Sequence, residues 1–213
     1  MSNDALIQEL SADLSPVRRR SALREAGLLL ALGVVELGLC LAFSLMRPDM
    51  GHMIGSTYML WKLGSLMILA GFSGTIALRS FSPGTFPRRG VTVAIALAGA
   101  AMIAGLFVPP AAQTGSTLLD RLAPVHGLFC ALAIVILSLP MLAMLATLMR
   151  RGAPVHPERS ALSAGLAAGT AGAFVFAFCC PINDPLYIVV WYFVGCTTVA
   201  TAARWLLPRR FSL

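Results

Sequence analysis

Residues 128–149 read LFCALAIVILSLPMLAMLATLM, a run of apolar and small polar side chains without a single charge. A helix rises about 1.5 Å per residue, so a run of this length can cross the roughly 30 Å hydrocarbon layer of a membrane. Inside that layer each backbone amide needs a partner within its own segment, which favours a helix over an open strand. We therefore predict an all-α membrane protein.

The rest of the chain has the same character. Hydrophobic residues make up 58% of the 213 positions and charged residues only 12%, whereas a soluble domain carries about a quarter charged residues. We predict a polytopic bundle of six transmembrane helices over residues 26–207, with short tails at 1–25 and 208–213. The predicted spans are about 26–45, 57–78, 91–108, 128–149, 160–178 and 187–207.

The arginines predict the orientation of these spans. Thirteen of the fifteen fall on one side as the spans alternate, in the two tails, in loops or, for Arg204, at the end of the sixth span, and only Arg47 and Arg121 fall on the other. Positive residues favour the cytoplasmic side, so we expect a multi-pass protein of the bacterial inner membrane with both termini in the cytoplasm. The net charge of +7 then indicates contact with anionic membrane lipids, not direct binding of nucleic acid.

The N-terminal tail carries one apolar stripe at helical spacing, made by Leu6, Ile7, Leu10 and Leu14. One interpretation is an amphipathic helix that lies on the membrane, but such helices usually carry a basic polar face, and this one is acidic. The other is a helix that docks into the groove of a cytoplasmic protein, with the leucines as anchors and acidic residues such as Asp13 facing a basic partner.

Two charged residues lie well inside the predicted spans, away from their cytoplasmic ends: Glu36 in the first and Lys62 in the second. A lone charge at the centre of a membrane helix costs about 2.5 to 3.5 kcal/mol, so we expect the two side chains to form an intramembrane charge pair. Such a pair either fixes the register of two helices or belongs to a proton or ion pathway. The second interpretation makes the chain a small transporter or channel.

Cysteines gather at the predicted outer ends of the spans. Cys130 lies at the start of the fourth span, with His126 one helical turn before it, and Cys180 follows the fifth. Cys130 and Cys180 are candidates for a disulfide, or with His126 for a soft-metal site, and the alternative is that they are ordinary buried thiols. The sequence has no Cys-x-x-Cys pair and no catalytic constellation, so we expect neither an enzyme nor a cofactor.

Four motifs resemble those of the NrsF family, bacterial inner-membrane anti-sigma factors. They are the tail ALIQELSADLSPVRR at 5–19, RPD at 47–49, SPG at 82–84 and CCPINDPLYIVVW at 179–191. The resemblance covers essentially the whole chain. It departs after Trp191, where the family usually has a histidine and this sequence has Tyr192.

The resemblance implies a cytoplasmic N-terminal segment that holds an extracytoplasmic-function sigma factor away from RNA polymerase. It implies a sigma-binding role for Leu6, Ile7, Leu10, Asp13 and Leu14. With it we expect Cys130 and Cys180 to sense a thiol-reactive metal or oxidant and to trigger release. The competing hypotheses are a transporter or channel that uses Glu36 and Lys62, and a quinone-linked thiol enzyme.

Overall fold

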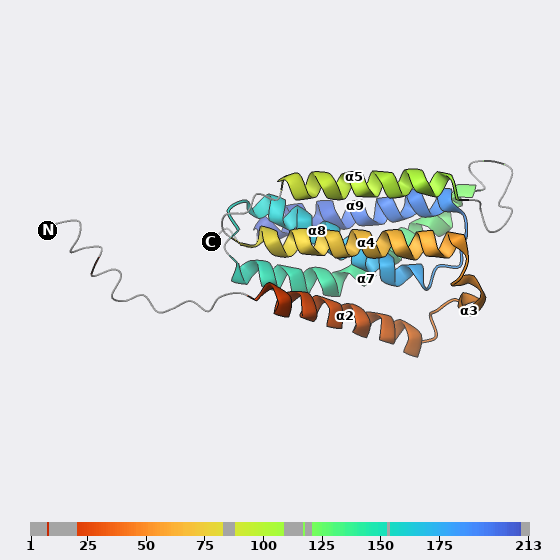
Figure 1. Cartoon of the computed structure of the whole chain (residues 1–213), viewed down its shortest axis with the longest axis horizontal. Helices are drawn as coiled ribbons and strands as arrows, with labels where there is room; N and C mark the ends of the chain where they lie inside the picture. The colour runs from red at the N-terminus through yellow and green to blue at the C-terminus, as the bar shows by residue number, and fades with distance from the viewer. Residues whose placement is uncertain are drawn as a thin grey trace.

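The structure is a computed structural model that describes residues 8, 21–82, 88–108, 117, 121–152 and 154–209. In these ranges it is an all-helical bundle without strands (Figure 1). Consecutive long helices run in opposite directions, and a short α3 lies between the first two. The helices are α2 (Ala22–Ala42), α3 (Met50–Met53), α4 (Thr57–Ser80), α5 (Arg88–Leu106), α7 (Pro124–Arg151), α8 (Pro157–Ala177) and α9 (Pro185–Arg209).

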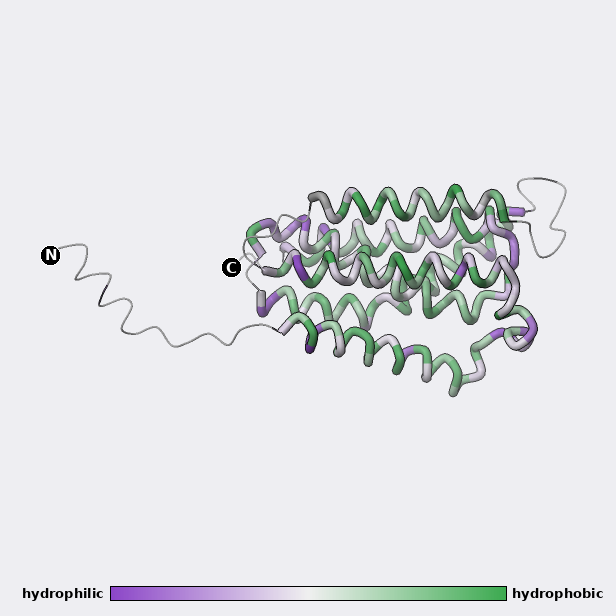
Figure 2. The backbone as a smooth tube through the Cα atoms, viewed as in Figure 1, coloured by the Kyte–Doolittle hydropathy of each residue, from purple (hydrophilic) through white to green (hydrophobic). Residues whose placement is uncertain are grey.

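Each of the six predicted spans falls on one long helix, which confirms the all-α prediction. Five of these helices are long and apolar enough to cross a membrane, and within α5 the apolar helix is shorter, Gly90–Gly105. Apolar residues run along the helices and polar ones gather at their ends (Figure 2). The short helix α3 was not predicted, because four residues are too few for a periodic pattern.

The helices begin where the sequence offers a capping group. The Ser21 and Ser56 hydroxyls accept hydrogen bonds from backbone amides at the starts of α2 and α4. Helices α7, α8 and α9 begin with proline, which has no amide proton to leave unpaired at the first helical position. Pro140 lies inside α7, and the helix continues through it.

Helix α8 is the centre of the bundle and packs against α4, α7 and α9, while α2 and α5 lie at opposite edges (Figure 1). Apart from Val175, each buried side chain of α8 is glycine, alanine, serine or threonine. These small residues let backbones approach closely: a methyl group on Gly165 would lie 2.7 Å from the Ala200 Cα atom of α9. The small-residue run of the fifth span is thus a packing seam.

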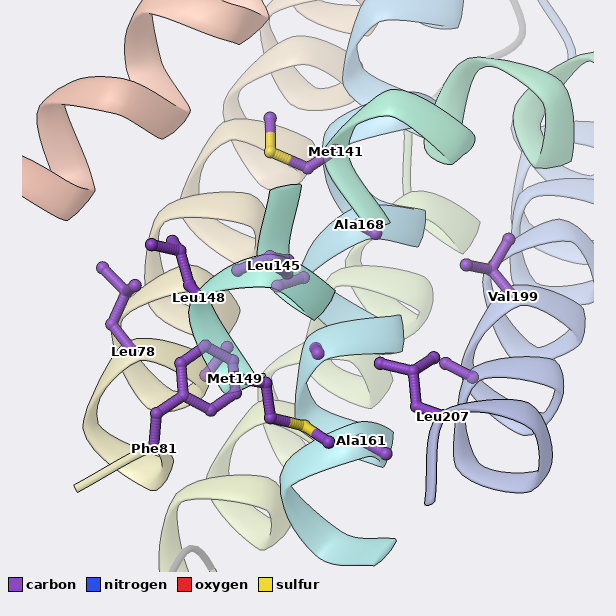
Figure 3. Packing of buried hydrophobic residues seen from close by; sticks show 14 residues of the cluster. Leu78, Phe81, Met141, Leu145, Leu148, Met149, Ala161, Ala168, Val199 and Leu207 are labelled. Carbon is purple, nitrogen blue, oxygen red and sulfur yellow. The ribbon is translucent and has the colours of Figure 1, made fainter. Parts of the chain in front are cut away.

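Two hydrophobic clusters occupy the interior. The arginine-end cluster lies where α4 and α7 end and α8 begins, and includes Phe81, Leu145 and Met149 (Figure 3). Hydroxyls link α4 to α8 nearby, with Ser80 Oγ 3.1 Å from Ser163 Oγ. The cysteine-end cluster lies at the other end of the bundle, next to the turn formed by residues 178–184.

Candidate functional site

The cysteine-end cluster brings together Cys130 of α7 and Cys180 of the turn between α8 and α9. Both side chains are buried, with 8% of Cys130 and none of Cys180 exposed. Three tyrosines share the cluster, and Cys130 Sγ lies 3.1 Å from the Tyr187 hydroxyl. Sulfur and phenol groups from separate helices therefore meet in one closed site. The buried residues of the cluster are Tyr58, Leu66, Cys130, Ile134, Ala173, Ala177, Cys180, Tyr187, Ile188 and Tyr192.

Lys62 of α4 points into the same region. Its side chain is 1% exposed, and its Nζ atom lies 5.6 Å from the centre of the Tyr192 ring, within the range of a cation–π interaction. Neither Lys62 Nζ nor the buried Tyr192 hydroxyl has a hydrogen-bond partner among the described residues. The site thus contains two buried donors that make no full hydrogen bond among the described residues and have the Cys180 sulfur near them.

The surroundings of Cys180 favour its thiolate form. The Cys130 thiol, the Lys62 ammonium, the Ile182 backbone amide and the Tyr192 hydroxyl lower the pKa of Cys180 and outweigh the burial that opposes them. The adjacent Cys179 differs, because burial raises its pKa to about 11. Since the thiolate is the nucleophile and the metal ligand, Cys180 is the more nucleophilic of these two neighbours toward a reagent that reaches the buried site.

Two arginines hold the C-terminal end of the turn that carries Cys180, at Asn183 and Asp184. Arg47 donates to both carboxylate oxygens of Asp49, each at 2.6 Å, and to the Asn183 side-chain oxygen at 2.7 Å. Arg121 donates to both carboxylate oxygens of Asp184, at 2.8 and 2.9 Å. The Arg47 guanidinium lowers the pKa of Asp49, mainly by hydrogen bonding. The Arg47–Asn183 hydrogen bond and the bidentate Arg121–Asp184 pair fix the turn against two other segments.

Aromatic side chains add further links to this end of the bundle. The Tyr58 hydroxyl donates to the Ile182 carbonyl at 3.1 Å, and the Trp191 indole donates to the Leu122 carbonyl at 2.8 Å. The indole also lies where a side chain on Gly127 would have to sit, so only glycine fits at that position. The turn that carries Cys180 is therefore tied to α4 through Tyr58, and α9 is tied through Trp191 to the segment that precedes α7.

The residues that form these contacts coincide with the motifs of the sequence. Arg47 and Asp49 belong to RPD, and Cys180, Asn183, Asp184 and Trp191 belong to CCPINDPLYIVVW. The chain matches the protein family described as negative regulator of sigma F over residues 10–212. It belongs to the NrsF family.

Two relatives in the NrsF family align with nearly the whole chain. Anti-sigma-F factor NrsF of Caulobacter vibrioides is 31% identical over 216 residues, which cover 97% of this chain and 99% of the relative. Probable anti-sigma-F factor NrsF of Azospira oryzae is 29% identical over 205 residues, or 92% of each chain. No solved structure matches the chain. The NrsF family is regulatory rather than catalytic, and its partner is a sigma factor.

The predicted charge pair between Glu36 and Lys62 is absent. Glu36 is buried on α2, and neither of its carboxylate oxygens has a hydrogen-bond partner among the described residues. Lys62 instead packs over Tyr192, on the side of α4 that faces the cysteine-end cluster. The prediction was wrong because two apolar helices give no sign of which face each turns toward the other.

His126 does not join the two cysteines. It is exposed at the start of α7, whereas Cys130 is buried one turn later. Within the ranges that the structure describes, no three histidine, cysteine, aspartate or glutamate side chains lie close enough to hold a metal ion. The described site is thus a pair of thiols without a third ligand of this kind.

The predicted sigma-binding residues Leu6, Ile7, Leu10, Asp13 and Leu14 lie outside the described residues. At the cysteine end, sequence reasoning missed the contribution of Tyr58, Tyr187 and Tyr192 and the roles of the arginine pairs. The motif RPD and the dipeptide Asp184-Pro185 were visible signals. An arginine isolated among apolar spans needs an acidic partner, and an aspartate before proline is a typical helix cap.

Proposed function

We propose that this NrsF family member is a membrane-embedded anti-sigma factor that holds an extracytoplasmic-function sigma factor through its N-terminal tail. Release follows when a thiol-reactive metal or oxidant acts on Cys130 and Cys180. The observation that carries the sensing part is the presence of these two cysteines in one buried cluster with Lys62 and Tyr187. The family match supports the regulatory part.

The proposal includes a six-span topology with both termini in the cytoplasm. The distribution of charge supports it, because the starts of α2 and α8 and the ends of α4 and α7 carry arginines at one end of the bundle. The opposite end holds Arg47 and Arg121, and each of these is neutralised by a carboxylate. An excess of positive residues at one end is what the positive-inside rule requires.

An oxidant would join the two cysteines in a disulfide. The two thiols would lose two protons and give two electrons to the oxidant as the Sγ–Sγ bond forms, and Cys130 would lose its contact with the Tyr187 hydroxyl. A thiophilic metal would displace the same two protons and bridge the sulfurs. Either event would tie α7 to the turn between α8 and α9 and would favour a second packing of these helices.

Binding of the sigma factor is tested with the full-length protein in detergent. We expect the extracytoplasmic-function sigma factor encoded nearest to this gene to co-purify with the wild type and to be lost from Leu10→Glu. The matched control is Ala12→Glu, which introduces the same charge on the opposite face of the expected tail helix and should retain the sigma factor. Loss in both variants, or in neither, would contradict docking through the apolar stripe.

Sensing is tested in cells with a reporter of sigma activity, with cadmium chloride or diamide as inducers. The double substitution Cys130→Ser and Cys180→Ser should abolish induction and preserve repression. Cys196→Ser, a cysteine change on α9, should leave both intact. Full induction in the double variant would remove the sensing proposal and leave the sigma-binding proposal standing.

A further inference from the structure

A cavity of about 430 Å³ lies between α4, α5, α8 and α9. This volume is within the range of about 300–1,000 Å³ that is typical of sites for small organic ligands. Its walls are almost entirely apolar, with Leu69 of α4, Ala98 of α5, Leu166 of α8 and Phe193 of α9 among the lining residues. Helix α5 packs on α4 and α9 and covers the cavity from the edge of the bundle.

The two unused donors of the cysteine end line this cavity. Lys62 and Tyr192 both belong to its wall, both are more than nine-tenths buried, and neither Lys62 Nζ nor the Tyr192 hydroxyl has a hydrogen-bond partner in the described ranges. Buried polar groups without partners are rare in folded proteins, and a lysine inside a membrane span is a functional candidate by default. A ligand with an acceptor at this position would satisfy both groups.

Chemistry at the two ends of the cavity differs. Along α4 the lining residues run from Trp61 and Lys62 to Ser73, and the eleven helical steps from Lys62 to Ser73 span about 16 Å. Along α9 they run from Ile188 to Thr201. The cationic group thus lies at one end of an elongated apolar cavity, an arrangement complementary to a molecule with one charged end and one long apolar tail.

The cavity also reaches the apolar outer surface of the bundle. Ile95 of α5 and Phe193 of α9 line it and are 60% and 52% exposed. A ligand dissolved in the membrane can therefore enter sideways between these two helices. The Lys62 ammonium has three N–H donors, so its interaction with Cys180 leaves donors for a ligand.

We propose that this cavity binds a single-chain fatty acid in its anionic form. The carboxylate accepts hydrogen bonds from Lys62 Nζ and the Tyr192 hydroxyl, and the acyl chain extends between α4 and α9 toward Thr201. A phospholipid fits less well, because its head group stays at the membrane surface whereas Lys62 is only 1% exposed. The inference goes beyond the proposed function, since binding is measured without a sigma factor.

The test uses the full-length protein in phosphatidylcholine nanodiscs with tritiated palmitate as the probe. We expect saturable binding that unlabelled palmitate displaces and that hexadecanol, which has the same chain without the charge, displaces at least tenfold less well. Lys62→Met should weaken palmitate binding at least tenfold. Equal competition by hexadecanol, or unchanged binding in Lys62→Met, would overturn the proposal.

A second variant covers the possibility that Lys62→Met does not fold. Ala98→Phe fills the cavity from α5 and should also remove saturable binding, whereas Ala100→Phe on the exposed side of the same helix should keep it. Mass spectrometry of the purified wild type distinguishes the source of the anion. Phosphatidylglycerol retained by the wild type and lost from Lys62→Met, with no palmitate bound, would reject the fatty acid as the ligand.

Discussion

The hydrophobic clusters at the two ends of the bundle differ in residue composition. The arginine-end cluster contains alanine, leucine, valine, methionine and one phenylalanine, and its side chains interlock without a polar atom among them (Figure 3). In the cysteine-end cluster, half of the ten buried residues are tyrosine or cysteine, and the unpaired Lys62 lies beside them. The arginine-end cluster contributes packing alone, whereas the cysteine-end cluster also contains thiol and phenol groups that can react.

This difference separates two tasks within the same helices. An apolar cluster responds only to changes of volume, so it keeps α4, α7, α8 and α9 in one arrangement. A buried polar cluster responds to protons, oxidants, metals and ligands, because each changes which hydrogen bonds and charges are satisfied. Substitutions at the two ends should therefore have different effects on stability and on reactivity.

The largest effect is expected from a substitution in the seam between α8 and α9. A side chain on Gly165 would collide with the Ala200 Cα atom and the Ala203 Cβ atom, each 2.7 Å from the new Cβ atom. Backbone atoms cannot move aside as a flexible side chain does, so we expect Gly165→Leu to cost about 3 kcal/mol of the free energy of unfolding. Unfolding in mixed micelles with increasing dodecyl sulfate measures it.

The matched control is Gly71→Leu on the outer face of α4, where no atom lies within 4 Å of the added Cβ. It should change the free energy of unfolding by no more than about 0.5 kcal/mol. Similar losses in the two variants would show that the seam is not tightly packed.

A smaller loss is expected when a charge is removed from the turn at the cysteine end. Asp184 is fully buried, accepts two hydrogen bonds from Arg121 and caps α9 through the Leu186 amide. Asp184→Asn keeps a capping oxygen and loses the ion pair, so the free energy of unfolding should fall by about 2 kcal/mol. Asp49→Asn removes a half-exposed partner of Arg47. It should lower the free energy of unfolding by less than Asp184→Asn does, in the same unfolding assay.

The third effect concerns reactivity instead of stability. In a variant that keeps only Cys130 and Cys180, iodoacetamide should modify Cys180 at a rate that changes little between pH 6 and pH 8. The reason is that its lowered pKa keeps the thiolate populated over this range. Adding Lys62→Met should slow the reaction at pH 7 about tenfold, equivalent to about 1.4 kcal/mol.

Mass spectrometry of the labelled peptide identifies the modified cysteine and gives its rate. An ordinary thiol, with a pKa near 8.5, would instead react about tenfold faster for each unit of pH in the lower part of the range. That profile in the Lys62-containing protein would contradict the proposed thiolate.

The smallest effect is expected at a hydroxyl link between α4 and α8. Ser73 Oγ lies 2.9 Å from Thr170 Oγ1, and hydrogen bonds between membrane helices contribute about 0.6 kcal/mol on average. Ser73→Ala should cost about that amount in the same unfolding assay. Thr75→Ala, whose hydroxyl bonds only to its own helix, should have no measurable effect. A double-mutant cycle with Thr170→Val isolates the contribution of the pair.

Most of the fold could be predicted from the sequence because the membrane imposes a strong length rule. Each apolar run of about 20 residues became one helix, and serine or proline marked where five of the six long helices begin. The packing could not be predicted in the same way. The long helices are apolar nearly all around, so no periodic pattern indicates which face of α4 meets α8 or α9.

The candidate site could be predicted only in part, for the same reason. Similar positions at the ends of their spans suggested that Cys130 and Cys180 lie at one depth, and the structure places them in one cluster. The neighbours of the other candidate residues depend on the rotation of each helix about its axis. It turned Lys62 toward Tyr192 and away from Glu36, and it turned His126 outward.

The small side chains of α8 also determine how this sequence can diverge. A single C-to-T transition changes an alanine codon to a valine codon, and this is among the commonest spontaneous mutations. On the outer face of α2 the two added methyl groups meet only lipid, and selection should tolerate them. At Ala164 or Ala168, which are fully buried between helices, the same change should be eliminated. Homologues should therefore vary freely on the outer face of α2 and, apart from the position of Val175, exchange only glycine, alanine, serine and threonine on the buried face of α8.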